Sequence, residues 1–506
     1  MFSKILIANR GEIAVRVIKT CRRMGLQSVV VYSEADAESL AVEMADESVL
    51  IGPPPAAQSY LLADRIIAAA HETGAEAIHP GFGFLSENAG FARACQDAGI
   101  VFIGPNPDAI DSMGDKIQSK KFAGRAGVSV VPGYVGEVRD VEHAISIAEE
   151  IGYPVMIKAS AGGGGKGIRV AWNRRDAEEG FPAVRAEAKG AFGDDRIFIE
   201  KFIENPRHIE IQVLGDRHGH IVYLFERECS IQRRHQKVLE EAPSAIVDPE
   251  MRRRMGEVAV RVAQAAGYTN AGTIEFLVDQ EKNFYFLEMN TRLQVEHPVT
   301  ELTTGLDLVH LQIRISAGEK LPFAQSDVKL RGHAIECRIY AEDPDNNFFP
   351  SPGKITLLLA PSGPGIRRDS GMYEGWTVPI DYDPLLAKLV GYGTDRVQAT
   401  SRLVRALNEY FVGGIKTNIS LFRRILNDPN FAAGHLDTGY LDRLLAQPND
   451  TAADDARSGQ VAAIAAGVFA VLDPAASLRA DEASTNGAGA EGASNWKRTA
   501  RQEAMN

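Results

Sequence analysis

The fold is decided by residues 272–290, GTIEFLVDQEKNFYFLEMN, which predict two strands joined by a tight turn. Apolar residues fill both halves, and the polar run around Glu281 and Lys282 separates them, as in a β-hairpin. Folding the chain about that turn places Glu275 opposite Glu288 on the partner strand. Period-two alternation puts Asn290 on the same face as Glu288. The segment therefore predicts a hairpin with two facing carboxylates.

Two carboxylates that face each other across strands repel, so a divalent cation between them is a physical reason for the pairing. Carboxylate and amide oxygens suit Mg²⁺ or Mn²⁺ better than zinc. We therefore interpret Glu275, Glu288 and Asn290 as metal ligands. The alternative is an exposed acidic hairpin face, and the apolar residues around both acids favour the metal.

Polar residues continue directly after the hairpin, in residues 291–300, TRLQVEHPVT. Arg292 has the planar fork that binds anions, and Glu296 is a candidate general base. A solvated loop is the alternative. A second polar cluster, RRHQK at residues 233–237, is either an anion site or a solvated surface run.

A glycine-rich stretch, ASAGGGGKG, precedes these segments at residues 159–167. Its glycines let the backbone approach a phosphate closely, and Lys166 adds positive charge. It is not a Walker A loop, because Lys166 is followed by glycine instead of serine or threonine. A glycine-rich hairpin with a purely structural role is the alternative, so the other candidate sites decide in favour of a nucleotide clamp.

The fold class predicted from these patterns is α/β (α+β), with four parts. Strand, helix and strand alternate in the first hundred residues, which is typical of a doubly wound, Rossmann-like lobe, although NRGEIA stands where a dinucleotide-binding GxGxxG motif would be. Next we expect a mobile glycine-rich lid and then a C-terminal mixed-sheet lobe. The predicted boundaries are 1–113 for the N-terminal lobe, 114–204 for the linker and lid, 205–446 for the catalytic and C-terminal lobe, and 447–506 for an Ala/Gly/Ser-rich, partly disordered tail.

Composition limits the class of protein. The 506 residues are 45% hydrophobic and 24% charged, as in ordinary globular proteins, and the net charge of −12 disfavours a nucleic-acid binder. Four cysteines without a CxxC pair predict buried reduced thiols. Residues 461–472 are too short for a membrane span of roughly 20 residues, and no signal-peptide core is present at the start. These features predict a cytoplasmic protein without a membrane partner.

Seven motifs follow one another between Met1 and about Leu445: KILIANRGEIA, HPGFGFLSEN, MGDK, IKASAGGGGKG, EKFIENPRHIEIQV, RRHQKVLEEAP and EMNTRLQVEHPVTE. In this order they resemble the ATP-grasp biotin carboxylases. The resemblance implies an ATP-grasp fold and an ATP-dependent carbon–nitrogen ligase that carboxylates biotin with bicarbonate. It also implies the first half-reaction of an acetyl-CoA or acyl-CoA carboxylase, in fatty acid biosynthesis. The alternatives are the same component of a pyruvate or 2-oxoglutarate carboxylase, and a non-catalytic ATP-grasp scaffold.

The resemblance also assigns roles to single residues. For the nucleotide, it implies that the phosphates contact Lys116 and Lys158 and that the lid contains Gly164 and Gly165. Adenine would be held by Glu200, Lys201 and Ile203. Further nucleotide contacts would come from His208, Gln232 and His235. Glu275, Glu288 and Asn290 match the metal positions.

For bicarbonate and biotin, the resemblance assigns a pocket, a base and an anion stabiliser. The bicarbonate pocket is formed by Lys237, Arg292, Gln294 and Val295. Glu296 is the base that deprotonates bicarbonate, and Arg338 stabilises the biotin enolate. Phe82 stands beside the biotin site, where the family often has tyrosine, so one hydroxyl donor is missing here.

The chain is expected to work with partners. The only lysine after Leu445 is Lys497, between Trp496 and Arg498, which does not match a biotin attachment turn. We therefore expect a separate biotin carboxyl carrier protein and a separate carboxyltransferase subunit, and the resemblance implies a homodimer. The final acceptor, whether acetyl-CoA, propionyl-CoA, a longer acyl-CoA, pyruvate or 2-oxoglutarate, depends on the partner.

Overall fold

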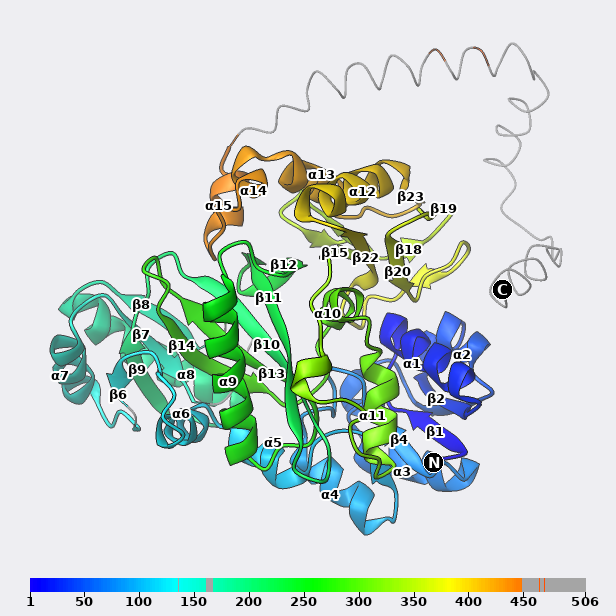
Figure 1. Cartoon of the computed structure of the whole chain (residues 1–506), viewed down its shortest axis with the longest axis horizontal. Helices are drawn as coiled ribbons and strands as arrows, with labels where there is room; N and C mark the ends of the chain where they lie inside the picture. Colours follow the sequence, from blue (N-terminus) through cyan, green and yellow to red (C-terminus); the bar gives the residue numbers. More distant parts are fainter. Residues whose placement is uncertain (135, 161–166, 448–463, 465–467, 469–506) are drawn as a thin grey trace. The chain divides into compact units, whose positions relative to one another are not determined.

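The computed structural model describes residues 1–447 apart from 135 and 161–166, and also Ile464 and Val468 (Figure 1). Met1–Leu444 forms one compact unit and Leu445–Asn506 a second. Within the described residues, no helix has the length and apolar character that a membrane crossing requires. The expected tail and the glycines of the lid lie outside the described residues, so the predictions for them remain untested.

The N-terminal lobe is a parallel sheet with helices around it, coloured blue in Figure 1. Its strand order is β3-β2-β1-β4-β5, and every neighbouring pair is parallel. This confirms the predicted doubly wound lobe. Gly25 closes α1 in the left-handed conformation at φ 70°. The elements are β1 (Lys4–Ile7), α1 (Gly11–Met24), β2 (Gln27–Ser33), α2 (Leu40–Met44), β3 (Glu47–Gly52), α3 (Ala63–Thr73), β4 (Ala77–His79), α4 (Ala89–Asp97), β5 (Val101–Phe102) and α5 (Pro107–Gly114).

A smaller lobe follows, with a four-stranded sheet in the order β6-β9-β7-β8. Apolar side chains on one face of this sheet, such as Val155 and Ile157, pack against Phe181 and Val184 of a long helix. The eight residues between β7 and β8, 160–167, belong to the glycine-rich stretch. The elements are α6 (Lys116–Arg125), β6 (Gly133–Tyr134), α7 (Val141–Ile151), β7 (Val155–Ala159), β8 (Ile168–Ala171), α8 (Arg174–Phe192) and β9 (Ile197–Lys201).

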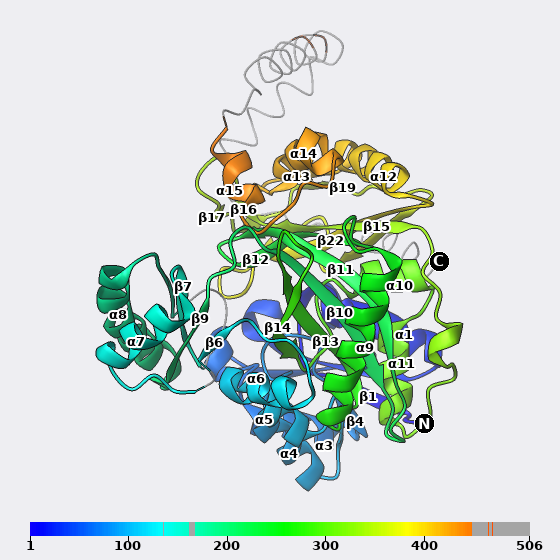
Figure 2. The ribbon, with the colours of Figure 1, turned by 60° about the vertical axis from the view of Figure 1, so that its left-hand side comes forward.

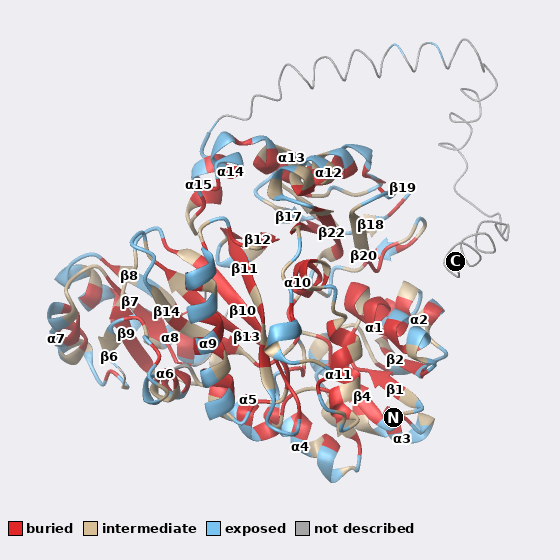
Figure 3. Cartoon of the chain, viewed as in Figure 1, coloured by how far each residue is buried: buried red, intermediate tan, exposed pale blue. Residues whose placement is uncertain are grey.

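The centre of the molecule is an eight-stranded sheet in the order β14-β13-β10-β11-β12-β15-β22-β20. Buried residues, red in Figure 3, follow β10, β11 and β13, and α9 packs on β10 and β11 (Figure 2). The strands and this helix are β10 (Arg207–Gly215), β11 (Ile221–Arg233), β12 (Gln236–Ala242), α9 (Pro249–Ala265), β13 (Asn270–Val278), β14 (Phe284–Asn290), β15 (His333–Tyr340), β20 (Ile366–Ser370) and β22 (Leu385–Gly393).

One detail of the predicted fold class is wrong: this sheet is not mixed. Every ladder between its eight strands is antiparallel. For three of its seven ladders the physical reason is that β10, β11 and β12 follow one another through short turns, as do β13 and β14. A short turn reverses the chain, whereas a parallel pair needs a crossover of a dozen or more residues.

The remaining elements cover the sheet. Helix α12 packs directly on β22, where a Cβ added to Gly391 would lie 2.8 Å from the backbone oxygen of Ala399, so only glycine permits this approach. The elements are α10 (His297–Thr304), α11 (Leu308–Ser316), β16 (Glu342–Asp343), β17 (Phe349–Pro350), β18 (Gly353–Lys354), β19 (Leu357–Leu359), β21 (Thr377–Val378), α12 (Arg396–Glu409), β23 (Phe411–Gly413), α13 (Ile419–Asn427), α14 (Pro429–Ala432) and α15 (Tyr440–Leu445).

The N-terminal lobe and the central sheet share one apolar core. Ile13 and Val17 of α1 belong to the same buried cluster as Leu308 and Ile313 of α11. All four cysteines are buried and unpaired, which confirms the expected reduced thiols. Because the lobes pack on a common core, residues far apart in the sequence meet between them.

Glu301 on α10 joins the lobes electrostatically and makes stability depend on pH. Its carboxylate lies 2.9 Å from Arg16 of α1 and 2.7 Å from Arg367 of β20. Burial alone would raise the pKa of Glu301, but the two arginines outweigh it and lower the pKa to about 2, from an ordinary 4.5.

The pKa of Glu301 is lower in the folded protein than in the unfolded chain. Its contribution to stability is therefore complete above about pH 4.5 and is lost as the pH falls towards 2. We expect Glu301→Gln to lower the unfolding midpoint at pH 7, with a difference from the wild type that shrinks steadily below pH 4.5. Urea unfolding of both proteins between pH 3 and 7 measures this. A difference that stays constant over that range would contradict the assigned ion pairs.

Candidate active site

A cavity of about 360 Å³ lies between the lid-lobe sheet and the central sheet. Sixteen residues predicted from the sequence line it. They are Lys158, Glu200, Lys201, Ile203, His208, Gln232, His235, Lys237, Glu275, Glu288, Asn290, Arg292, Gln294, Val295, Glu296 and Arg338. Phe82 does not line this cavity. The side chain of Lys116, at the start of α6, and the glycines Gly164 and Gly165 lie outside the described parts of the chain.

On the lid side, β7 and α6 bring two lysines to one carboxylate on β9. Lys158 and Lys120 both form ion pairs with Glu200, which is buried. Lys158 also lines the cavity, where its ammonium can attract phosphate. The Lys201 ammonium instead donates to the carbonyl oxygens of Gly152 and Tyr153, at 2.9 and 3.0 Å.

Apolar side chains also line this cavity. They come from strands of both sheets and from the connection after β9: Met156, Ile168, Phe202, Ile203, Leu277 and Leu287. Of these, only Ile203 was predicted as a site residue. A slot with apolar walls beside a lysine pair suits a flat base joined to a phosphate chain.

The hairpin register is confirmed. Glu275 on β13 pairs directly with Glu288 on β14, and both side chains line the cavity. The Asn290 amide donates to Glu275 at 2.8 Å. Glu275 is buried, whereas Glu288 is half-buried. The set of hard oxygen donors fits Mg²⁺ or Mn²⁺, and the assignment of these three residues as metal ligands remains a prediction.

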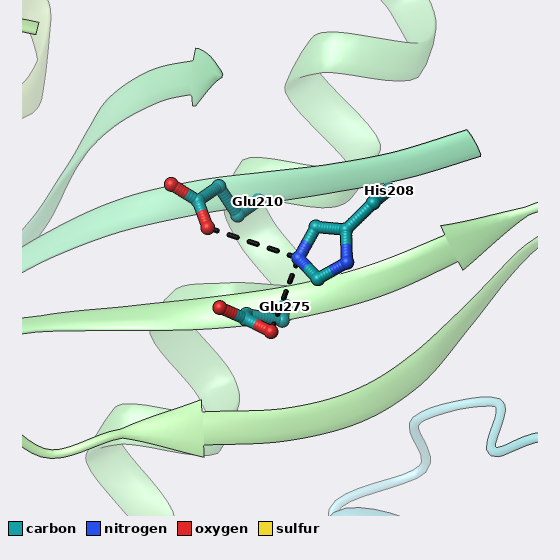
Figure 4. Close-up of side chains that lie close together, drawn as sticks. All are labelled: His208, Glu210 and Glu275. Carbon is teal, nitrogen blue, oxygen red and sulfur yellow. Dashed lines mark ion pairs between the residues drawn. The ribbon is translucent and has the colours of Figure 1, made fainter. Parts of the chain in front are cut away.

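Figure 4 shows a second grouping around Glu275, in which His208 and Glu210 of β10 lie beside it. The imidazole of His208 lies 3.0 Å from Glu275 and 3.9 Å from Glu210. Burial lowers the pKa of His208, but the charge of Glu275 outweighs it, so the pKa is raised overall. In its protonated form, the His208 imidazole would oppose a metal ion between itself and Glu275.

Lys237 on β12 is the electrostatic centre of the site. Its ammonium lies 2.5 Å from Glu210, 2.8 Å from Glu275 and 2.7 Å from Glu296. Burial opposes the charged form, but the three carboxylates outweigh it and raise the pKa of Lys237 well above its usual value. Arg227 lies behind this cluster, fully buried, with its guanidinium on Glu210 and Gln294.

Glu296 lies between two cations. One oxygen is 2.7 Å from Lys237 and the other is 3.0 Å from Arg338, whose guanidinium also donates to Glu240 at 2.6 Å. Burial alone would raise the pKa of Glu296, but Lys237 and Arg338 hold it well below its usual range. The carboxylate is therefore ionised and able to accept a proton. Its burial also shows that the solvated-loop interpretation of residues 291–300 is wrong.

The basic run 233–237 divides between two environments. His235 and Lys237 line the cavity, whereas Arg233 pairs with Glu342 at 3.2 Å and lies over the ring of Phe348. The anion-site interpretation remains a prediction for His235 and Lys237, whereas Arg233 is neither in that cavity nor solvated. In the strand register Lys237 pairs with Gln232 and Arg233 with Gln236, so Arg233 and Lys237 lie on opposite faces.

Arg292 is held by the N-terminal lobe. Glu87, which follows β4, accepts from the Arg292 guanidinium at 2.8 Å and from the backbone N–H of Thr291 at 2.9 Å. Sequence reasoning missed Glu87, Glu210, Arg227 and Glu240. Glu210 had a detectable signal, because period-two alternation puts it on the same face as His208. Glu87 lies within the quoted HPGFGFLSEN motif.

A second cavity, of about 490 Å³, adjoins the first between the N-terminal lobe and the end of the central sheet. Phe82, Phe84 and Tyr382 line it. Arg292, Val295 and Arg338 line both cavities, so their side chains separate the space that contacts Glu296 from the space that contacts Phe82.

Comparison with known families identifies the chain. Three family models match: the N-terminal domain of biotin carboxylase over residues 1–110, the ATP-binding domain of the carbamoyl-phosphate synthase L chain over 115–324, and the C-terminal domain of biotin carboxylase over 336–443. A biotin carboxylase of Halalkalibacterium halodurans is 54% identical over 441 residues, which are 87% of this chain and 97% of that protein. The chain belongs to the biotin carboxylase family. The resemblance, the ATP-grasp fold and the ATP-dependent ligase class are thereby confirmed.

Other members of the biotin carboxylase family are larger. The propionyl-CoA carboxylase alpha chain of Ruegeria pomeroyi is 56% identical over 87% of this chain, and the human mitochondrial one is 55% identical over the same share. The matched region is 68% and 61% of those two proteins, so the chain spans about two thirds of their length.

Solved structures of biotin carboxylases share the fold. The biotin carboxylase domain dimer of Hydrogenobacter thermophilus 2-oxoglutarate carboxylase, in complex with MgADP, ADP and bicarbonate, has a TM-score of 0.86 and 48% identity. It covers 89% of this chain and all of that one. Campylobacter jejuni biotin carboxylase in a nucleotide complex has a TM-score of 0.86 and 47% identity, over 88% and 99% of the two chains.

Proposed function

We propose that this chain is a biotin carboxylase that uses ATP and bicarbonate to carboxylate biotin carried on a separate protein. The observation that carries the proposal is the ionised Glu296, buried between Lys237 and Arg338 in a cavity that Lys158 and Glu200 also line. The base and its neighbouring cations lie in the same cavity as the phosphate-binding wall. This arrangement suits a reaction in which an anion is deprotonated and then attacks a phosphoryl group.

In the first step, Glu296 removes the proton of bicarbonate, which Lys237 and Arg292 hold by its oxygens. A bicarbonate oxygen then attacks the γ-phosphate, the bond to ADP breaks, and carboxyphosphate forms. Lys158 holds the phosphate chain, and the apolar slot holds adenine. Bound at Glu275, Glu288 and Asn290, Mg²⁺ or Mn²⁺ would neutralise phosphate charge.

In the second step, carboxyphosphate decomposes to CO₂ and phosphate. The phosphate removes the ureido proton of biotin, and Arg338 stabilises the enolate that results, because a buried guanidinium is pre-oriented towards developing negative charge. The ureido nitrogen then attacks CO₂ to form the new carbon–nitrogen bond. Arg338 lines both cavities, which supports this role at the point where the two substrates meet.

We propose an acyl-CoA carboxylase as the complete system, with propionyl-CoA as the first acceptor to test. The propionyl-CoA carboxylase relatives support it over acetyl-CoA and fatty acid biosynthesis, and 2-oxoglutarate and pyruvate remain alternatives. A biotin carboxyl carrier protein, a carboxyltransferase subunit and a second copy of the chain are the proposed partners. The cytoplasmic location remains a prediction.

The direct test is ATP cleavage by the purified chain with bicarbonate, with and without free biotin. We expect phosphate release to require bicarbonate and to increase when biotin is added. Phosphate release that depends on neither compound would overturn the proposal, and so would the absence of any ATP cleavage, which a non-catalytic scaffold predicts.

A further inference from the structure

A lysine without contact with solvent lies directly behind the loop that carries Glu296. Lys388 on β22 has no exposed surface, and its ammonium donates to the backbone carbonyl of Val295 at 3.0 Å. Its counter-charges are Glu12 at 3.2 Å and Asp369 at 4.0 Å. Removing an ammonium from water is costly unless charged and polar partners compensate for it, and Glu12, Asp369 and the Val295 carbonyl are such partners.

The carbonyl that Lys388 holds belongs to the peptide linking Val295 to Glu296. Fixing the plane of that peptide restricts the direction in which the Glu296 side chain leaves the backbone. Val295 also lines both cavities, and the Phe82 ring lies 5.8 Å from the Lys388 ammonium. The lysine thus contacts the point where the proposed bicarbonate and biotin spaces join.

The partner of Lys388 comes from another lobe. Glu12 is in the first turn of α1, is buried, and borders the second cavity. The chain just after β20 lies tightly on this turn, since a Cβ added to Gly371 would be 2.9 Å from the backbone nitrogen of Glu12. Helix α1, strand β22 and the Glu296 loop therefore meet at one ammonium group.

We propose that Lys388 is a positioning residue for the carboxylation of biotin: its ammonium, whose charge Glu12 of the N-terminal lobe balances, fixes the Val295–Glu296 peptide and thereby sets the geometry of the base. This inference rests on the proposed function. The opposing view is an ion pair that only stabilises the packing of two lobes, and it predicts that removing both charges together leaves catalysis intact.

The test is the double variant Lys388→Met/Glu12→Gln, which removes the ammonium without leaving Glu12 as an uncompensated carboxylate. We expect kcat for bicarbonate-dependent ATP cleavage to fall at least about 10-fold, the scale of a misplaced catalytic group. The KM for ATP should stay within about twofold, because the lysine pair on Glu200 belongs to the lid lobe. A folded double variant with wild-type kcat would overturn the proposal.

A matched control removes an ion pair that lines neither cavity, between the partly buried Arg252 on α9 and the buried Glu226 on β11. Arg252→Met/Glu226→Gln should lower the thermal midpoint and leave kcat within about twofold of the wild type. Equal losses of kcat in the two double variants would count against a specific role of Lys388.

A single variant covers the case in which the double variant does not fold. Glu12→Gln keeps the ammonium and its bond to Val295, so its loss of kcat should stay below about threefold. A loss of 10-fold or more would show that the Glu12 carboxylate, and not the Lys388 ammonium, fixes the loop that carries Glu296, and would overturn the proposal. A wild-type chain without bicarbonate-dependent cleavage would instead refute the proposed function itself.

Discussion

Replacing Glu296 with Gln is expected to lower kcat for bicarbonate-dependent ATP cleavage by about 10²–10⁴-fold, the usual contribution of a positioned general base. The amide has nearly the same shape but cannot take the bicarbonate proton. The KM for ATP should change little, because Lys158 and Glu200 lie on the lid sheet and do not contact Glu296. Steady-state phosphate release at several ATP concentrations measures both constants.

The Glu296→Gln protein should remain folded, which makes its loss of activity interpretable. Lys237 keeps Glu210 and Glu275 as partners, and Arg338 keeps Glu240. A circular dichroism melt provides the control. If the folded variant retains more than a tenth of the wild-type kcat with bicarbonate, Glu296 is not the base.

Replacing Lys237 with Met is expected to lower the free energy of unfolding by about 3–5 kcal/mol, the usual result of removing one partner from a buried charge cluster. Three carboxylates, from Glu210, Glu275 and Glu296, would then face one another without the ammonium that now contacts each of them. Bicarbonate-dependent ATP cleavage should be lost as well. Urea unfolding at pH 7.5 measures the stability.

The loss in the Lys237 variant should shrink at lower pH, because carboxylates that have lost a neighbouring ammonium take up protons more readily and then repel one another less. The matched control is Lys282→Met, which removes an exposed ammonium 3.8 Å from Asp248 and should cost less than about 1 kcal/mol. A Lys237 loss as small as that control, or one that does not change between pH 5 and 8, would contradict the charge cluster.

The hairpin shows what could be predicted from sequence alone. Strand alternation and a polar turn were enough to pair Glu275 with Glu288, because register within a hairpin depends only on residues close in the chain. The residues that line the cavity were predicted from the motif resemblance for the same reason, because each motif is a short stretch of neighbouring residues. The direction of the central strands was not predicted, because alternation indicates a strand and does not indicate the direction of its neighbour.

The residues that were missed act across long distances in the sequence. Glu87 contacts Arg292, 205 positions away, and Glu240 contacts Arg338 across two strands of the sheet. Lys388 similarly meets Glu12, 376 positions earlier in the chain. No local pattern predicts such contacts, since they result from the packing of whole lobes. Arg233 and Lys237, four residues apart, show the converse: one run of basic residues serves two different environments.

The account rests on a bicarbonate oxygen attacking the γ-phosphate of ATP beside Glu296 and Lys237. The most direct measurement supplies ¹⁸O-labelled bicarbonate in unlabelled water and determines the mass of the phosphate released in a short incubation with ATP, Mg²⁺ and biotin. We predict one ¹⁸O atom in each phosphate, transferred when carboxyphosphate breaks down. Phosphate without label would mean that water attacks ATP, which contradicts the account.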